Sequence, residues 1–144
     1  MDFFNRLVDD ECPYPKNVEY EFDGHCFRSR FEMAIAQVIK DLGLLYKYDS
    51  GLQVGTRVLY PDFTLGFPEF DFCIFLEALG RLDNPKYVND SVEKIRDYSN
   101  SGFVLDLDYA LIGASEKNMP NNLKIRMKII EVVGALCAIY VIPV

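Results

Sequence analysis

The segment over residues 71–79, DFCIFLEAL, is apolar on both of the faces that a β-strand would present. Successive side chains of a strand point to opposite faces, so Phe75 and Glu77 would share one face and Ile74 would lie on the other. A strand that buries both faces lies inside a sheet that is covered on both sides. Since helical patterns precede and follow this segment, we expect a single α/β domain.

The size and composition of the chain indicate one globular domain. It has 144 residues, of which 50% are hydrophobic, and this is enough to bury a sizeable core. No apolar run approaches the roughly 20 residues of a membrane span, and nothing resembles a signal peptide. These features predict a cytoplasmic protein without a membrane segment.

The cysteines exclude one class of metal site and disfavour one class of enzyme. They are scattered as Cys12, Cys26, Cys73 and Cys137 without a CxxC pair, and His25 is the sole histidine, so zinc-ligand spacing is absent. We expect reduced and mostly buried thiols. A thiol enzyme using Cys26 with His25 is disfavoured, because adjacent residues of a strand point to opposite faces.

The net charge of −7 argues against strong nonspecific nucleic-acid binding, because phosphate repels an acidic surface. It does not exclude a nuclease, since some carboxylates would be metal ligands and a bound divalent cation reverses the local field. A homo-oligomer or a partner protein could supply the basic surface.

Residue patterns predict the order of the elements. An N-terminal arm over 1–19 precedes a domain over 20–144. The first half of the domain has a short strand or turn at 20–25, a helix from about 29 to 42, and strands at 44–48, 56–65 and 71–79. The second half has a helix at 85–100, a strand at 103–112, a helix at 123–136, and a final strand or tail at 138–144. The helix stripe at 123–136 is carried by Leu123, Met127, Ile130, Val133 and Leu136.

Glu32 stands in the first turn of the first long helix and has two interpretations. Ser29 and Glu32 have the S-x-x-E spacing of a capping box, in which the carboxylate satisfies a backbone N–H. Alternatively, Glu32 is a helix-borne carboxylate directed at the sheet. The local pattern favours the cap and leaves both open.

Glu77 and Lys94 also have two interpretations each. A buried carboxylate such as Glu77 is costly unless it is paired or binds a cation, so it is either a metal ligand or the partner of Arg81 or Lys94, or it lies exposed at the strand end. Lys94 lies beside the apolar stripe of its helix, from where it could reach the sheet. Alternatively, it is a solvated lysine that pairs with Asp90.

Four segments, taken in order, resemble motifs of one superfamily. They are RSRFE at 28–32, YPDFT at 60–64, EALGRLDNPKY at 77–87, and the helix positions Lys94, Ile95, Tyr98 with Gly102. Together they resemble the PD-(D/E)XK nuclease superfamily, in particular its phage and bacterial endonuclease-like branch. Each segment is short, whereas the ordered set is fairly specific.

This resemblance implies a restriction-endonuclease-like core, with a mixed central sheet of about four strands flanked by helices. It implies a metal-dependent DNA endonuclease in which Asp62 and Glu77 hold Mg²⁺ or Mn²⁺ with Glu32 nearby. Oxygen ligands in this number suit Mg²⁺, which keeps several of its waters. Arg28 and Arg81 are the expected contacts to DNA.

Position 79 departs from the superfamily pattern. A standard D/E-x-K motif places lysine two residues after Glu77, and this chain has Leu79 there. Lys94 is the expected substitute, with Arg81 as the second choice. If neither reaches the metal, the alternative is a catalytically inactive nuclease-fold module that binds nucleic acid or serves protein assembly through its apolar C-terminal residues.

Overall fold

The computed structural model describes the backbone of residues 3–115 and 117–140, with side chains up to Leu136. The helices are α1 (Phe3–Arg6), α2 (Arg30–Asp41), α3 (Pro85–Asn100) and α4 (Asn122–Tyr140), with a 3-10 helix η1 (Pro68–Phe70). The strands are β1 (Glu21–Phe22), β2 (His25–Cys26), β3 (Leu45–Tyr48), β4 (Leu52–Val54), β5 (Arg57–Leu59), β6 (Phe63–Phe67), β7 (Phe72–Leu79) and β8 (Tyr109–Gly113).

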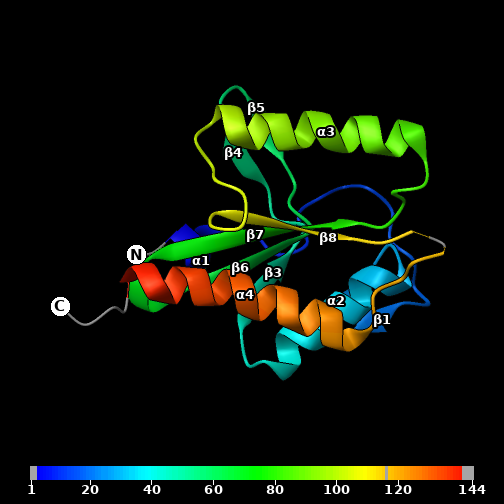
Figure 1. Ribbon diagram of the computed structural model, residues 1–144, viewed down its shortest axis with the longest axis horizontal. Helices are drawn as coiled ribbons and strands as arrows, with labels where there is room; N and C mark the ends of the chain where they lie inside the picture. The colour runs from blue at the N-terminus through cyan, green and yellow to red at the C-terminus, as the bar shows by residue number, and fades with distance from the viewer. Residues whose placement is uncertain (1–2, 116, 141–144) are drawn as a thin grey trace.

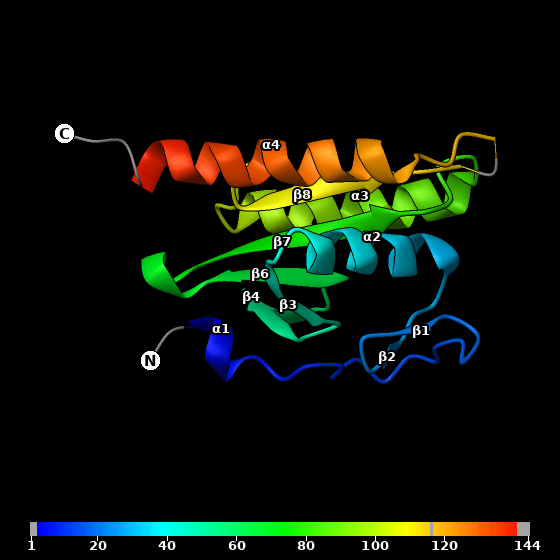
Figure 2. The same ribbon diagram turned by 90° about the horizontal axis from the view of Figure 1, so that it is seen from below.

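A four-stranded sheet in the order β3-β6-β7-β8 forms the centre of the domain. Strand β6 pairs antiparallel with β3 and with β7, whereas β7 pairs parallel with β8. Figure 1 shows α3 on one face of this sheet and α2 with α4 on the other, and Figure 2 shows the same layers from below. The expected α/β domain with a mixed four-stranded sheet and flanking helices is therefore confirmed.

The sheet separates two hydrophobic clusters. The cluster under α2 and α4 includes Ile35, Ile39, Phe63, Ile74, Leu76, Ile125 and Ile129. The cluster on the α3 face includes Phe4, Leu52, Leu59, Cys73, Phe75, Tyr98 and Tyr109. Strand β7 supplies alternate residues to the two clusters, as its sequence predicts, and it is buried along most of its length. Glu77 follows Phe75 by two residues and so faces α3.

Both long helices in the middle of the chain begin where the sequence predicts. Ser29 is the N-cap of α2, and its hydroxyl accepts from the backbone N–H of Glu32 at 3.1 Å. Gly43 follows the helix with φ of +73°, a conformation that glycine adopts without strain. Helix α3 begins at Pro85 behind the N-cap Asn84, whose side chain accepts from Tyr87 N.

The predicted strand at 56–65 is wrong in its continuity. The chain forms β5, breaks over residues 60–62, and resumes as β6, which ends at Phe67. Pro61 lies in the break, where the absence of its N–H costs no ladder hydrogen bond. Strand β5 instead pairs with β4 in a small hairpin that the sequence reasoning missed.

The predicted strand at 103–112 is shorter than expected. Only Tyr109–Gly113 pairs with β7, and the preceding residues form a turn in which Asp106 has φ of +62° and the Asp108 carboxylate accepts from Val104 N at 2.7 Å. Helix α4 continues to Tyr140, so a final strand beginning at residue 138 is wrong, and residues 141–144 lie outside the described part of the chain. Among the described residues, no helix is long and apolar enough to cross a membrane.

Candidate active site

Asp62 connects the elements that carry the predicted site residues. It precedes β6, and its Oδ2 accepts from the backbone N–H of Ala78 in β7 at 2.7 Å. Its negative charge contributes to raising the pKa of both Glu32, in the first turn of α2, and Glu77, in β7. The three carboxylates therefore belong to one electrostatic neighbourhood, although they come from three elements.

Glu32 is buried and bonded on one of its oxygens. Its Oε1 accepts from the Tyr48 hydroxyl at 2.8 Å and from the backbone N–H of Arg28 at 3.1 Å. Glu32 thus satisfies a backbone N–H, as the capping interpretation expects, but the donor is Arg28, which precedes the N-cap Ser29, and the same carboxylate is also bonded to Tyr48 of β3. Burial raises the pKa of Glu32 to about 7, and the charge of Asp62 adds to the shift.

Arg28 lies among several carboxylates. Its guanidinium bonds both oxygens of Asp49, at 3.0 and 2.5 Å, and Asp49 is fully buried. The Nη1 atom of Arg28 lies 3.8 Å from Oε2 of Glu32 and 4.0 Å from Oδ1 of Asp62. Lys16 also pairs with Asp49 at 3.1 Å. Arg28 thus neutralises the α2 side of the site and is not a free surface arginine.

Glu77 has a partner on each oxygen. Lys94 Nζ lies 2.8 Å from Oε2, and the Tyr98 hydroxyl donates to Oε1 at 2.6 Å. Both partners come from α3, four residues apart, so they lie on one face of that helix. Burial raises the pKa of Glu77 to about 8, and Asp62 adds to the shift while Lys94 and Tyr98 oppose it.

Lys94 joins α3 to two other elements. Besides Glu77, its ammonium donates to the backbone carbonyl of Tyr60 at 2.9 Å. Burial by itself would lower the pKa of Lys94, but the charges of Glu77 and Asp62 outweigh it and raise the pKa. Lys94 is therefore charged and directed at the sheet, and the alternative pairing with Asp90 is wrong.

The structure does not bring the three carboxylates into one ligand shell. Among the residues it describes, no group of three or more His, Cys, Asp or Glu is arranged to hold a metal ion. Glu32 lies in α2 and is bonded to Tyr48 of β3, whereas Glu77 of β7 faces α3 and is bonded there to Lys94 and Tyr98.

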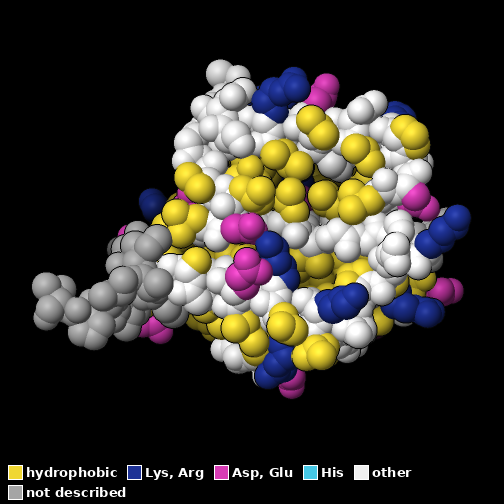
Figure 3. All heavy atoms as spheres, in the orientation of Figure 1, with side chains coloured by type: hydrophobic (Ala, Val, Ile, Leu, Met, Phe, Trp, Pro, Cys, Tyr) yellow, Lys and Arg dark blue, Asp and Glu magenta, His cyan; other side chains and the backbone are white. Residues whose placement is uncertain are grey.

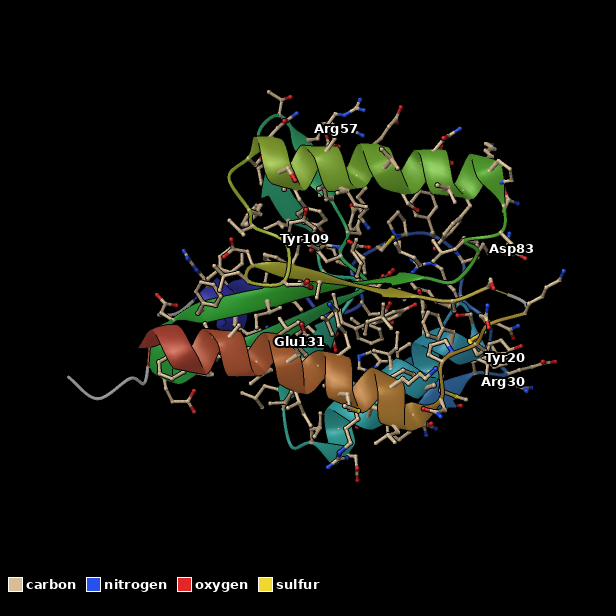
Figure 4. All side chains as sticks on the ribbon, viewed as in Figure 1. Tyr20, Arg30, Arg57, Asp83, Tyr109 and Glu131 are labelled. Atoms are coloured by element: carbon tan, nitrogen blue, oxygen red, sulfur yellow. The ribbon has the colours of Figure 1, made fainter. Side chains whose placement is uncertain are left out.

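The remaining predicted residues lie apart from this centre. Arg81 is exposed in the loop after β7, and Leu79 is half-buried at the end of that strand. Figure 4 shows Arg30 and Asp83 on the same side of the molecule, near the beginnings of α2 and α3. This side of the molecule therefore carries both basic and acidic side chains.

Sequence reasoning missed three residues that hold the carboxylates in place. Tyr48 and Asp49 follow one another at the end of β3, where the pattern indicated only a strand and a turn. Tyr98 is one of the helix positions that carry the resemblance, which gave it no role toward a carboxylate, and it is fully buried in α3. Its spacing of four residues from Lys94 was the one available signal that both reach the same partner.

Comparison of the chain with protein-family models found no match. Searches among curated proteins and among solved structures likewise found no similar chain.

Proposed function

We propose that this protein is a metal-dependent endonuclease-like protein that hydrolyses phosphodiester bonds of DNA, with Mg²⁺ or Mn²⁺ as its cofactor. One observation carries the proposal. Asp62 acts electrostatically on two buried glutamates, Glu32 and Glu77, whose pKa values are both raised. Buried acidic groups that repel one another are characteristic of sites that receive a cation.

The donor chemistry of this site fits a hard divalent cation. All three side chains are carboxylates, and Mg²⁺ takes oxygen ligands while keeping several waters. Glu32 Oε2 and Asp62 Oδ1 each lie near Arg28 Nη1, at 3.8 and 4.0 Å. These two oxygens would be the first ligands, and Glu77 would join after exchanging its bond to Lys94 or Tyr98.

A bound divalent cation would supply an acidified water and positive charge opposite the phosphate. The residues of the chain have separate tasks around it. Lys94, held between Glu77 and the Tyr60 carbonyl, would take the part of the lysine of a D/E-x-K motif. From there it would orient the attacking water and balance charge on the phosphate. Arg28 and Arg81 would contact the DNA backbone, Arg28 by exchanging Asp49 for phosphate.

A specific observation favours a second candidate, a nuclease-fold module without catalysis. The carboxylates already have cationic partners, because Arg28 neutralises the Glu32 side and Lys94 neutralises Glu77. Position 79 also has leucine, which cannot orient water. In this candidate the ion pairs are structural, and the domain serves nucleic-acid binding or assembly.

The decisive experiment is cleavage of plasmid and branched DNA with Mg²⁺ or Mn²⁺. Asp62→Ala is expected to lose activity by roughly 10²-fold or more, because it removes the residue that links both glutamates. The matched control is Asp83→Ala, which removes an exposed carboxylate outside the site and is expected to cleave like the wild type. Equal activity in Asp62→Ala and the wild type would refute the endonuclease.

Calorimetry separates the two candidates when no cleavage is seen. The endonuclease requires Mn²⁺ binding to the wild type that is lost in Asp62→Ala and Glu77→Gln and kept in Asp83→Ala. Absence of Mn²⁺ binding to the wild type would support the second candidate, in which these carboxylates only form structural ion pairs.

A further inference from the structure

Helix α4 carries an apolar stripe on its exposed side. Ile125, Ile129 and Leu136 are buried against the sheet, whereas Leu123 and Met127 are each 62% exposed and Ile130 is 51% exposed. These last three belong to the apolar periodicity by which the sequence predicts the helix, and the structure leaves them exposed. The helix is thus apolar on two sides, and the core explains only one of them.

The exposed stripe has the spacing of a helix-pairing seam. Leu123, Met127, Ile130 and Gly134 follow one another at intervals of four, three and four residues. This is the alternation of a and d positions in a heptad pattern, by which one helix packs along another. We refer to these four residues as the α4 seam.

A groove continues the seam toward α2. It has a volume of about 290 Å³ and is lined by Leu42, Leu44, Ile129, Ile130, Val133 and Gly134. At Gly134 a Cβ would meet no atom within 4 Å, so the glycine leaves a notch in the seam. Figures 1 and 2 show α2 and α4 side by side, and Figure 3 shows hydrophobic side chains gathered along this part of the surface.

We propose that the α4 seam is a homodimer interface, in which α4 packs antiparallel against α4 of a second copy around a two-fold axis. The seam is complementary to itself in this orientation. Leu123 of one copy lies opposite the partner's Gly134, and Met127 lies opposite the partner's Ile130. Each copy therefore offers a projecting leucine at one end of the seam and a notch at the other, and a two-fold axis fills both notches.

The charges beside the seam fit the antiparallel orientation, in which both exposed charged residues find a partner. Lys124 and Glu131 are exposed, and each follows a seam residue directly, so they occupy equivalent e positions seven residues apart. In an antiparallel pair, e positions face e positions, and Lys124 meets the partner's Glu131 twice across the axis. In a parallel pair, e positions face g positions, so Glu131 would meet the partner's Arg126, which already pairs with Asp41 at 2.6 Å, and Lys124 would face position 119, which precedes α4. Opposite charges at such positions set partner choice and orientation.

A second copy is the occupant that these observations support, because helix α4 itself carries both the projecting and the receiving parts of the contact. The partner needs an apolar helix with one small residue, a projecting leucine at the matching distance, and a basic and an acidic residue in the matching order. Helix α4 itself has all of these features. The inference does not depend on metal binding or on cleavage.

The experiment is sedimentation equilibrium of the full chain over a wide concentration range. The wild type is expected to form a monomer–dimer equilibrium, and Met127→Glu is expected to weaken it roughly tenfold or more by placing a charge in the seam. The matched control is Val18→Glu, which puts the same charge at a residue that is 78% exposed and far from α4 in the sequence. Circular dichroism of each variant checks that it is folded.

A charge exchange tests the orientation. Lys124→Glu is expected to weaken the dimer, because two acidic residues would then face one another across the axis. The double variant Lys124→Glu with Glu131→Lys is expected to restore it. A wild type that stays monomeric throughout the concentration series would overturn the proposal. So would a dimer that is unaffected by Met127→Glu, or one that the double variant does not restore.

Discussion

Glu32 and Glu77 are both buried carboxylates near Asp62, but the protein stabilises them differently. Glu32 is bonded through Oε1 to a tyrosine and a backbone N–H, while its Oε2 lies 3.8 Å from the Arg28 guanidinium. Glu77 has each oxygen bonded, one to an ammonium and the other to a tyrosine. Both side chains are buried, but Glu77 has a close partner on each carboxylate oxygen, whereas Glu32 has its close partners on one oxygen.

The difference indicates which carboxylate is more available to a ligand. Glu32 can accept a cation on its second oxygen without losing a hydrogen bond, whereas Glu77 must exchange one. The basic side chain beside each glutamate differs as well. Arg28 also binds Asp49, whereas Lys94 binds Glu77 and the Tyr60 carbonyl. The Glu32 side is therefore the open half of the site, and the Glu77 side is the closed half.

The largest effect is expected from removing the cation on the closed side. Lys94→Met should lower the free energy of unfolding by about 3 kcal/mol, because it leaves Glu77 buried without its charged partner. Arg28→Met should cost less, since Asp49 keeps Lys16 at 3.1 Å and Glu32 keeps its bond to Tyr48. Urea denaturation measures both.

Lys86→Met is the control for this comparison, because Lys86 is an exposed lysine at the beginning of the same helix as Lys94. It should change the free energy of unfolding little. If Arg28→Met lowered the free energy of unfolding more than Lys94→Met, the contacts of Arg28 with Asp49 and Glu32 would be more important for stability than the Lys94–Glu77 pair.

The pH dependence of stability is the next largest effect. The pKa values of Glu32 and Glu77 in the folded protein, about 7 and about 8, are above their ordinary value of 4.5. The folded state thus holds these protons more tightly than the unfolded state, and its stabilisation is complete below pH 4.5 and lost as pH rises to 7 and 8. In a chelating buffer, the free energy of unfolding should fall by roughly 2 kcal/mol per pH unit between pH 5 and 7.

Glutamine variants assign this decrease to the two halves. Glu32→Gln should remove the part of the decrease that is complete near pH 7, and Glu77→Gln the part that extends to about pH 8. Denaturation curves at several pH values check this. Stability that stays constant or rises over this range in the wild type would contradict the burial argument for both residues.

The smallest effect is expected from the two tyrosine hydroxyls. Tyr98→Phe and Tyr48→Phe should each cost about 1 kcal/mol, because each removes a hydrogen bond to a buried carboxylate. Each should also raise the pKa of its own glutamate and shift only that part of the pH dependence. Tyr14→Phe, at a residue that is 66% exposed, is the control. If one variant shifted the pH dependence of both glutamates, Glu32 and Glu77 would be titrating as a coupled pair.

Sequence patterns were sufficient where local chemistry decides the structure. Strand β7 and helix α3 formed where predicted, because an apolar run bounded by turn residues and a proline after an N-cap act over a few residues. They failed where strand pairing decides. The break at Pro61 and the shortened β8 depend on which backbone groups find a partner across the sheet.

The candidate site divides in the same way. The sequence by itself determined that Glu77 lies on an apolar strand, that Ser29 and Glu32 have the spacing of a capping box, and that Lys94 lies beside the apolar stripe of its helix. Only the tertiary structure decided that Glu32 and Glu77 lie with opposite layers of the sheet and that Tyr48, Asp49 and Tyr98 complete their hydrogen bonds. A sequence pattern fixes the face of an element on which a side chain lies, whereas its partners depend on how distant elements pack.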